Sequence, residues 1–194
     1  MQGIDCQEKS DEELVRLASE NQSYFLCIMK RHEERLFRYI RRISNFSFEE
    51  AEDILQEVFI KVYQNLNSYD PSLKFSSWIY RITHNHVISS FRKLKSRAEG
   101  QVFEITEEEF NNISGEFDVL KEVDAQLNKE LLGKVLNQLE PKYRDVLVLK
   151  FLEERDYKEI SDIIKKPMGT VATLINRAKK KMEKEIESQN IQFK

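Results

Sequence analysis

The sequence contains little that would interrupt, cross-link or anchor a chain. Its 194 residues include five glycines, three prolines, one tryptophan and two cysteines, which is typical of a soluble, charge-rich and helix-prone protein. The cysteines, Cys6 and Cys27, lack the spacing of a metal site, and they imply no disulfide framework. Cys27 falls within an apolar helical stretch, so we expect it to be a buried thiol.

Long apolar runs are also missing. No stretch is long enough to span a bilayer, and the N-terminus lacks a signal-peptide pattern. We therefore expect a cytoplasmic protein with no direct membrane insertion.

Neither sign of charge dominates, because the net charge is only −3. The distribution of charge is more informative than the sum. Residues 79–97 carry five basic residues and no acidic one, whereas residues 98–126 carry nine acidic residues and one basic residue. Basic segments therefore flank an acidic connector, which the net charge conceals.

The most informative segment is residues 156–181. A capping box at Asp156 and Glu159 starts a first helix, and Pro167 ends it, because proline disfavours helical geometry in the preceding residue. Apolar residues then recur at intervals of three and four in a second helix. Residues 165–181 include six basic residues and no acidic one. The pattern predicts a helix-turn-helix with a recognition helix suited to a major groove. The alternative is a solvated charged face on an ordinary helical hairpin.

The rest of the chain also shows helical periodicity. We expect Trp78 to pack in the core with its apolar neighbours, and His32 to be a packed or half-exposed side chain rather than a metal ligand. The predicted fold is all-α, with two small helical domains at residues 10–97 and 128–187 joined by an acidic flexible linker at residues 98–127. The helices expected before the helix-turn-helix cover residues 11–19, 23–43, 47–66, 76–96, 128–138 and 141–152.

Three separated blocks carry a family resemblance. They are AEDILQEVF at residues 51–59, FSSWIYRITHN at residues 75–85, and LEPKYR at residues 139–144 together with the helix-turn-helix. In this order and spacing they resemble the bacterial RNA polymerase sigma factors of the extracytoplasmic-function (ECF) type. The first domain then corresponds to sigma region 2 and the second to sigma region 4.

The resemblance implies a promoter-specificity initiation factor without enzymatic activity or cofactor. Such a protein binds core RNA polymerase through its beta and beta-prime subunits, recognises and melts the minus-ten element of promoter DNA, and reads the minus-thirty-five element. An anti-sigma factor is the expected regulatory partner.

The resemblance also assigns residues to these roles. The core polymerase contacts match Asp53, Gln56, Glu57 and Lys61. The minus-ten contacts are expected at Asn67, Tyr69, Phe75, Ser76, Arg81, Asn85 and Arg92. The minus-thirty-five contacts are expected at Tyr157, Lys158, Thr170, Ala172, Thr173, Asn176, Arg177 and Lys180.

Some positions depart from the family pattern. Many relatives have an aspartate where this chain has Ser89, and many have a basic residue and a serine where Ala172 and Thr173 stand. These changes leave the fold unaffected, but promoter preference is not transferable from relatives. The acidic linker has two open interpretations, an RNA mimic in a basic polymerase channel or a plain spacer.

Two other functions compete with this hypothesis. A standalone regulator would bind duplex DNA through the C-terminal domain alone, which leaves the first two blocks without a purpose. A metal-dependent enzyme acting on phosphodiesters would use Asp53 and Glu57, one helical turn apart, as metal ligands. We expect no histidine or third carboxylate to join that pair.

Overall fold

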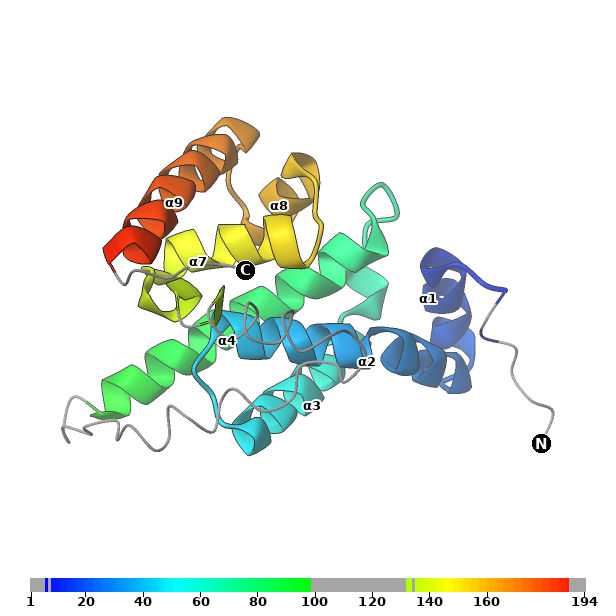
Figure 1. Cartoon of the computed structure of the whole chain (residues 1–194). Coiled ribbons are helices and arrows are strands. Elements are labelled where there is room, and N and C mark those ends of the chain that lie inside the picture. Colours follow the sequence, from blue (N-terminus) through cyan, green and yellow to red (C-terminus); the bar gives the residue numbers. More distant parts are fainter. Residues whose placement is uncertain (1–5, 7, 99–131, 134, 189–194) are drawn as a thin grey trace, which may run out of the picture.

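The computed structural model describes residue 6 and residues 8–98, 132–133 and 135–188. Throughout these ranges the regular secondary structure is helical and no strand occurs, so the predicted all-α class is confirmed (Figure 1). The predicted linker, residues 98–127, lies outside the described residues except for Ala98, which ends a helix. None of the described helices combines the length and apolar composition that crossing a bilayer requires.

The N-terminal unit is built from four α-helices and one short 3-10 helix. Capping boxes start two of these helices, with Ser10 and Glu13 before α1 and with Ser47 and Glu50 before α3. Helix α2 packs against α1 and α3, and α4 packs against α2 and α3. The elements are α1 (Asp11–Glu20), α2 (Ser23–Ile43), α3 (Phe48–Gln64), η1 (Leu66–Ser68) and α4 (Phe75–Ala98).

The C-terminal unit contains the predicted helix-turn-helix. It comprises α7 (Pro141–Leu147), η3 (Val148–Leu152), α8 (Tyr157–Ile164) and α9 (Met168–Ser188). The expected single helix at residues 141–152 changes to a π-helical turn in η3, where the amide of Glu153 donates to the carbonyl of Val148, five residues back. Residues 132–133 and 135–138 are helical, in the range expected for the preceding helix.

The two units pack against each other. Helix α4 contacts α8, and α2 contacts α7 and η3, so the helices of the C-terminal unit lie along those of the N-terminal unit (Figure 1). One apolar core runs through both units, from Leu14 in α1 to Ala178 in α9. Trp78 and His32 are buried within the N-terminal unit, as expected.

The expectation about the cysteines is half wrong. Cys27 is buried, but it forms a disulfide with Cys6 instead of being a free thiol. Arg31 of α2 explains how the N-terminal segment reaches this helix. Its guanidinium donates to the carbonyls of Cys6 at 2.5 Å and Lys9 at 2.9 Å, and it pairs with Asp11 at 2.8 Å. The Cα atoms of the two cysteines are thereby held 5.5 Å apart.

Candidate functional site

The outer face of α3 forms a continuous polar ridge. Asp53, Gln56, Glu57 and Lys61 are all exposed on it, because their spacing places them on one side of a helix. The opposite side of α3 is buried in the core. We call these four residues the α3 ridge. The structure thus brings together all four predicted core polymerase contacts.

Glu57 has a histidine neighbour that the sequence did not reveal. The Nε2 atom of His86, on α4, lies 2.8 Å from Oε2 of Glu57. Burial lowers the pKa of His86, and the adjacent carboxylate offsets this only in part. His86 thus contacts one carboxylate of the Asp53 and Glu57 pair. No group of three histidine, cysteine or acidic side chains arranged to hold a metal ion occurs among the described residues.

The predicted minus-ten residues divide into exposed and covered positions. Asn67, Asn85 and Arg92 are exposed, and Arg81 is half-buried on the same stripe of α4. Ser76, in the first turn of α4, is half-buried.

Phe75 lies under this surface rather than on it. Its side chain is fully buried, and its ring centroid is 5.4 Å from that of Tyr69 and 5.5 Å from that of Trp78. The phenol of Tyr69 donates to the carbonyl of Leu73 at 2.5 Å, and burial raises its pKa to about 12. Phe75 therefore belongs to the core in this structure, and its ring has no exposed face for a base.

The predicted recognition helix is α9. Its buried side holds Val171, Ile175 and Ala178. Thr173 uses its hydroxyl to donate to the carbonyl of Gly169 at 2.9 Å, which leaves its oxygen as an acceptor. Of the predicted minus-thirty-five residues on this helix, Ala172 is half-buried, and the exposed ones are Thr170, Thr173, Asn176, Arg177 and Lys180.

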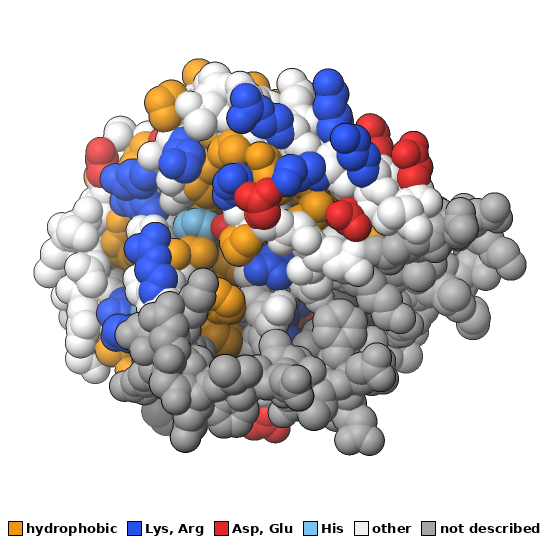
Figure 2. Space-filling view, turned by 90° about the vertical axis from the view of Figure 1, so that its left-hand side faces the viewer, with side chains coloured by type: hydrophobic (Ala, Val, Ile, Leu, Met, Phe, Trp, Pro, Cys, Tyr) orange, Lys and Arg blue, Asp and Glu red, His pale blue; other side chains and the backbone are white. Residues whose placement is uncertain are grey.

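Helix α8 is the first helix of the helix-turn-helix, and both of its ends are defined by local structure. Its capping box is formed by Asp156 and Glu159, as predicted, and it ends at Lys165 in the left-handed conformation, with φ of 54°. Tyr157 and Lys158, in its first turn, are exposed. Lys and Arg side chains spread over the face of the molecule that α4 and α9 reach, with hydrophobic side chains between them (Figure 2).

Some of these basic side chains form ion pairs with acidic side chains of the same chain. Lys181 of α9 pairs with Glu140 at 2.5 Å and lies over the ring of Tyr143 at 4.8 Å. Hydrogen bonds from Lys142 and Lys181 lower the pKa of Glu140 to about 2. Lys181 thus fixes α9 against α7, whereas the predicted contact Lys180 stays exposed.

A buried polar group lies where the two units meet. The hydroxyl of Tyr39, on α2, lies 3.1 Å from Nδ1 of His84 on α4, and Nε2 of His84 lies 3.9 Å from Asp145 on α7. Burial raises the pKa of Asp145 to about 7 and lowers that of His84 to about 4. Near neutral pH the imidazole is therefore uncharged.

Sequence reasoning missed two side chains beside the minus-ten residues. Glu153 and Arg155, in the connection between η3 and α8, contact Tyr80 and Ser76 on α4. They lie more than seventy residues away in the sequence, and no local motif marks them.

Comparison with known proteins identifies the family of this chain. The Sigma-70 region 2 family matches residues 28–97, and the Sigma-70 region 4 family matches residues 129–182. The ECF RNA polymerase sigma factor SigW of Bacillus subtilis (strain 168) is 34% identical over 178 residues, covering 86% of this chain and 90% of SigW. The ECF RNA polymerase sigma-E factor of Escherichia coli (strain K12) is 26% identical, with 92% of this chain and 95% of that protein covered.

A solved structure shares the fold. The sigma factor RpoE from Bartonella quintana, solved in complex with the anti-sigma factor NepR, superposes with a TM-score of 0.68 at 18% identity, over 84% of this chain and 96% of that one. Both sigma regions occur in this chain in the expected order, and the match to SigW runs through nearly all of it. The chain therefore belongs to the ECF RNA polymerase sigma factors.

Proposed function

We propose that this protein binds core RNA polymerase and directs it to promoters by recognising and melting the minus-ten element and reading the minus-thirty-five element. The observation that carries the proposal is the presence of two different exposed surfaces on two helical units. One is the mixed-charge α3 ridge, and the other is the acid-free outer face of α9 between Thr170 and Lys181.

The α3 ridge is the proposed site for core polymerase. Its two carboxylates, one amide and one amine are all exposed, and only Glu57 already has a side-chain neighbour among the described residues, the buried His86, so the other three can pair with a partner without breaking such a contact. Charged groups at the rim of an interface mainly set register and association rate. The beta-prime subunit, whose homologues receive this helix in related sigma factors, is the proposed partner of the ridge.

The two proposed DNA contacts differ in kind. Thr173, Asn176 and Arg177 present an acceptor, an amide and a guanidinium on one helix face, which suits base edges in a major groove. Arg81, Asn85 and Arg92 follow a stripe along α4, which suits the phosphates and bases of a separated strand. We therefore assign duplex reading to α9 and strand capture to α4.

The remaining proposals follow from the family. We propose that the protein acts in the cytoplasm as a non-catalytic factor and that an anti-sigma factor restrains it. Bartonella quintana RpoE, which shares the fold of this chain, was solved in complex with the anti-sigma factor NepR, and this supports the partner class.

Run-off transcription with purified core polymerase, on the promoter upstream of the protein's own gene, tests the proposal. We expect a discrete transcript only when the chain is added, and co-elution of the chain with core polymerase. A standalone regulator would instead bind the duplex, fail to co-elute with core polymerase and yield no transcript.

A further inference from the structure

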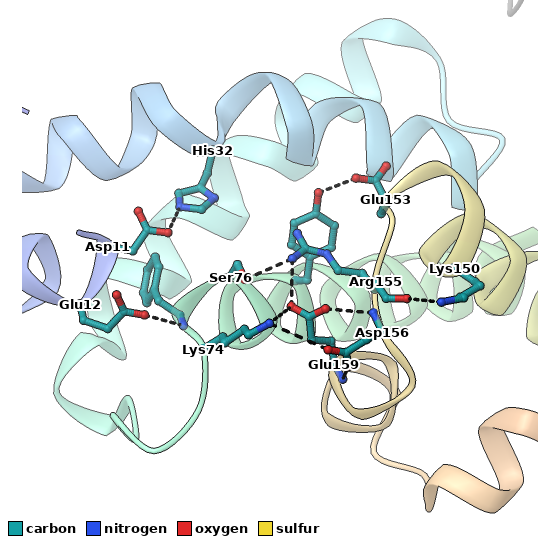
Figure 3. A network of polar contacts seen from close by, with 12 residues as sticks. Asp11, Glu12, His32, Lys74, Ser76, Lys150, Glu153, Arg155, Asp156 and Glu159 are labelled. Carbon is teal, nitrogen blue, oxygen red and sulfur yellow. Dashed lines mark hydrogen bonds and ion pairs between the residues drawn. The ribbon is translucent and has the colours of Figure 1, made fainter. Parts of the chain in front are cut away.

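A polar network joins the C-terminal unit to the start of α4. It is centred on Glu153 and Arg155, in the connection between η3 and α8, and it extends to Lys74 and Glu159 (Figure 3). The sequence motifs and the family match leave Glu153 and Arg155 without a role. The network lies against the predicted minus-ten segment.

Glu153 joins three elements through one carboxylate. Its Oε2 accepts a hydrogen bond from the Tyr80 hydroxyl of α4 at 2.6 Å, and its Oε1 accepts one from the Arg42 guanidinium of α2 at 2.7 Å. Arg42 also donates to the carbonyl of Leu152 at 3.3 Å. Only 6% of the Glu153 side chain is exposed, so these contacts replace most of its hydration.

Arg155 covers the first turns of α4. Its guanidinium carbon lies 4.2 Å from the centroid of the Tyr80 ring, and its Nη1 donates to the hydroxyl of Ser76 at 3.1 Å. Glu159 lies 3.5 Å from the same nitrogen and accepts a hydrogen bond from Lys74 at 3.2 Å. Figure 3 shows these side chains converging between the connection and α4.

The backbone of the connection makes this convergence possible. Glu154, between the two key residues, has φ of 54°, in the left-handed region that L-residues rarely occupy. The π-helical turn of η3 precedes it, and the amide of Arg155 donates to the carbonyl of Leu149 at 2.9 Å. Together these features direct both Glu153 and Arg155 onto α4.

We propose that Arg42, Tyr80, Glu153 and Arg155 form an interdomain latch, an autoinhibitory contact that must open before promoter DNA is engaged. The latch is defined by these four residues, and the inference rests on the proposed function. Arg155 uses the hydroxyl of Ser76, a residue assigned to the minus-ten element, so the closed latch and the DNA compete for that group.

The distance between the two promoter elements also requires the latch to open. In the closed structure the hydroxyl of Ser76 lies 3.1 Å from Nη1 of Arg155, which is two residues before the first residue of α8. The minus-ten and minus-thirty-five elements are roughly 25 base pairs, or about 85 Å, apart along a duplex. The two units cannot contact both elements while they are joined in this way. Thirty extended residues between the units span at most about 100 Å, which is enough for the open state.

The edge of the interface favours reversible opening. A cavity of about 70 Å³ between the units is lined largely by polar side chains, including Lys74, Ser77, Lys158 and Asp162. The buried hydroxyl of Ser77 has no hydrogen-bond partner among the described residues. A cavity and a buried hydroxyl without a protein partner show that this edge of the interface is packed less tightly than a core, which suits a contact that is made and broken.

Zero-length cross-linking of the full chain tests whether the latch exists. A water-soluble carbodiimide activates a carboxyl group, and the Lys74 amine then displaces it to form an amide, while the carbodiimide takes up the elements of water and leaves as a urea. We expect peptide mapping by mass spectrometry to find Lys74 joined to Glu159 or Asp156 in the protein alone. We expect less of this product when core polymerase and promoter DNA are added.

Variants connect the latch to activity. Glu153→Ala should lower the yield of the Lys74 cross-link about tenfold, because it leaves Arg42 and Tyr80 without their shared acceptor. It should also speed promoter opening by the reconstituted polymerase. Glu33→Ala is the control, since Glu33 is an exposed carboxylate on α2 and is not one of the latch residues, and it should leave both readouts at the wild-type level. Tyr80→Phe removes only the hydroxyl that donates to Glu153. If Glu153→Ala loses its cooperative thermal transition, the cross-link yield and the rate of promoter opening of Tyr80→Phe test the latch instead.

The outcomes separate this inference from the proposed function. Absence of the Lys74 cross-link in the wild-type chain, or an unchanged yield in both latch variants, would overturn the latch. Fewer cross-links without faster promoter opening would overturn its inhibitory role. A chain that cross-links as expected but supports no transcription by core polymerase would overturn the proposed function, and the inhibitory role with it.

Discussion

The α3 ridge and the minus-ten segment belong to the same helical unit, but the structure presents them in opposite states. Every predicted contact of the ridge is exposed. In the minus-ten segment Phe75 is fully buried, Ser76 is half-buried and its hydroxyl is bound by Arg155. Under the proposed function, this conformation leaves the core polymerase contacts accessible and covers two of the minus-ten contacts, Phe75 and Ser76.

The difference follows from what each surface packs against. Helix α3 packs on α2 and α4 through one face only, so its other face remains in water. The first turns of α4 lie between α1 on one side and α8 on the other. Glu12 of α1 accepts a hydrogen bond from the amide of Phe75 at 3.4 Å, which adds a second constraint on this segment.

The largest expected effect is on the stability of the covered segment. Phe75→Ala should lower the free energy of unfolding by about 3–5 kcal/mol, because it leaves a cavity beneath the rings of Tyr69 and Trp78. Thermal or urea denaturation followed by circular dichroism measures the change. Phe91→Ala, on the same helix but with 41% of its side chain exposed, is the control and should cost much less. Equal losses in both variants would show that the aromatic cluster is not part of the core.

The next prediction concerns how stability depends on pH through two groups at the interface between the units, His84 and Asp145. Their contributions compensate each other in the wild type. Between pH about 4 and 6.5 the unfolded chain carries a proton on His84, whereas the folded chain carries one on Asp145. The numbers of bound protons are equal, so these two groups together give the wild type little change in stability over this range. Tyr39 contacts the pair from α2, and Arg144 lies beside it on α7.

Single substitutions should expose opposite slopes. In Asp145→Asn the unfolded state binds one more proton than the folded state, so stability should rise with pH from about 4 to about 6.5. In His84→Gln the folded state binds the extra proton, so stability should fall from about pH 4 to about pH 7. Each slope should reach at most about 1.4 kcal/mol per pH unit. Urea titrations at several pH values measure them, and slopes of the same sign would contradict the assignment.

A change on the α3 ridge should affect binding and leave the fold intact. Asp53→Ala combined with Gln56→Ala should weaken core polymerase binding by about tenfold while changing stability by less than about 0.5 kcal/mol. Glu52→Ala provides the matched control, since Glu52 is exposed on α3 outside the ridge. Fluorescence anisotropy of each labelled variant measures its affinity for core polymerase. If the control weakened binding as much as the double variant, general acidity rather than the ridge would account for the contact.

The smallest expected effect is the loss of stability on removing the N-cap of α3, the helix that carries the ridge. Ser47→Ala removes the side chain that accepts from the amide of Glu50 at 3.2 Å, and it should cost about 1 kcal/mol of stability. Ser89→Ala, at an exposed position of α4, should cost almost nothing in the same denaturation experiment. A loss confined to Ser89→Ala would contradict the capping assignment.

Features set by neighbouring residues were predictable from the sequence. The capping boxes at Ser47 and Asp156, the burial of Trp78 and the shared face of the α3 ridge all depend on spacings of a few residues, and the structure agrees with them. The helix-turn-helix also depends on spacings of a few residues, and the structure contains it as α8 and α9.

Features set by distant residues were not predictable. The disulfide joins Cys6 and Cys27 across 21 residues, and it depends on how Arg31 holds the N-terminal segment. The burial of Phe75 depends on packing against Tyr69 and His32 as well as on helical period. The contact of Arg155 with Ser76 spans 79 residues and requires the packing of one unit on the other.

Promoter opening by core polymerase tests the account most directly. A duplex containing a promoter recognised by this protein, with 2-aminopurine in the minus-ten element, reports strand separation as a rise in fluorescence. We expect the rise to require both core polymerase and this chain, and to be slower with the double variant of Asp53 and Gln56 and faster with Glu153→Ala. Duplex binding by the chain with no fluorescence rise in the presence of core polymerase would contradict the account.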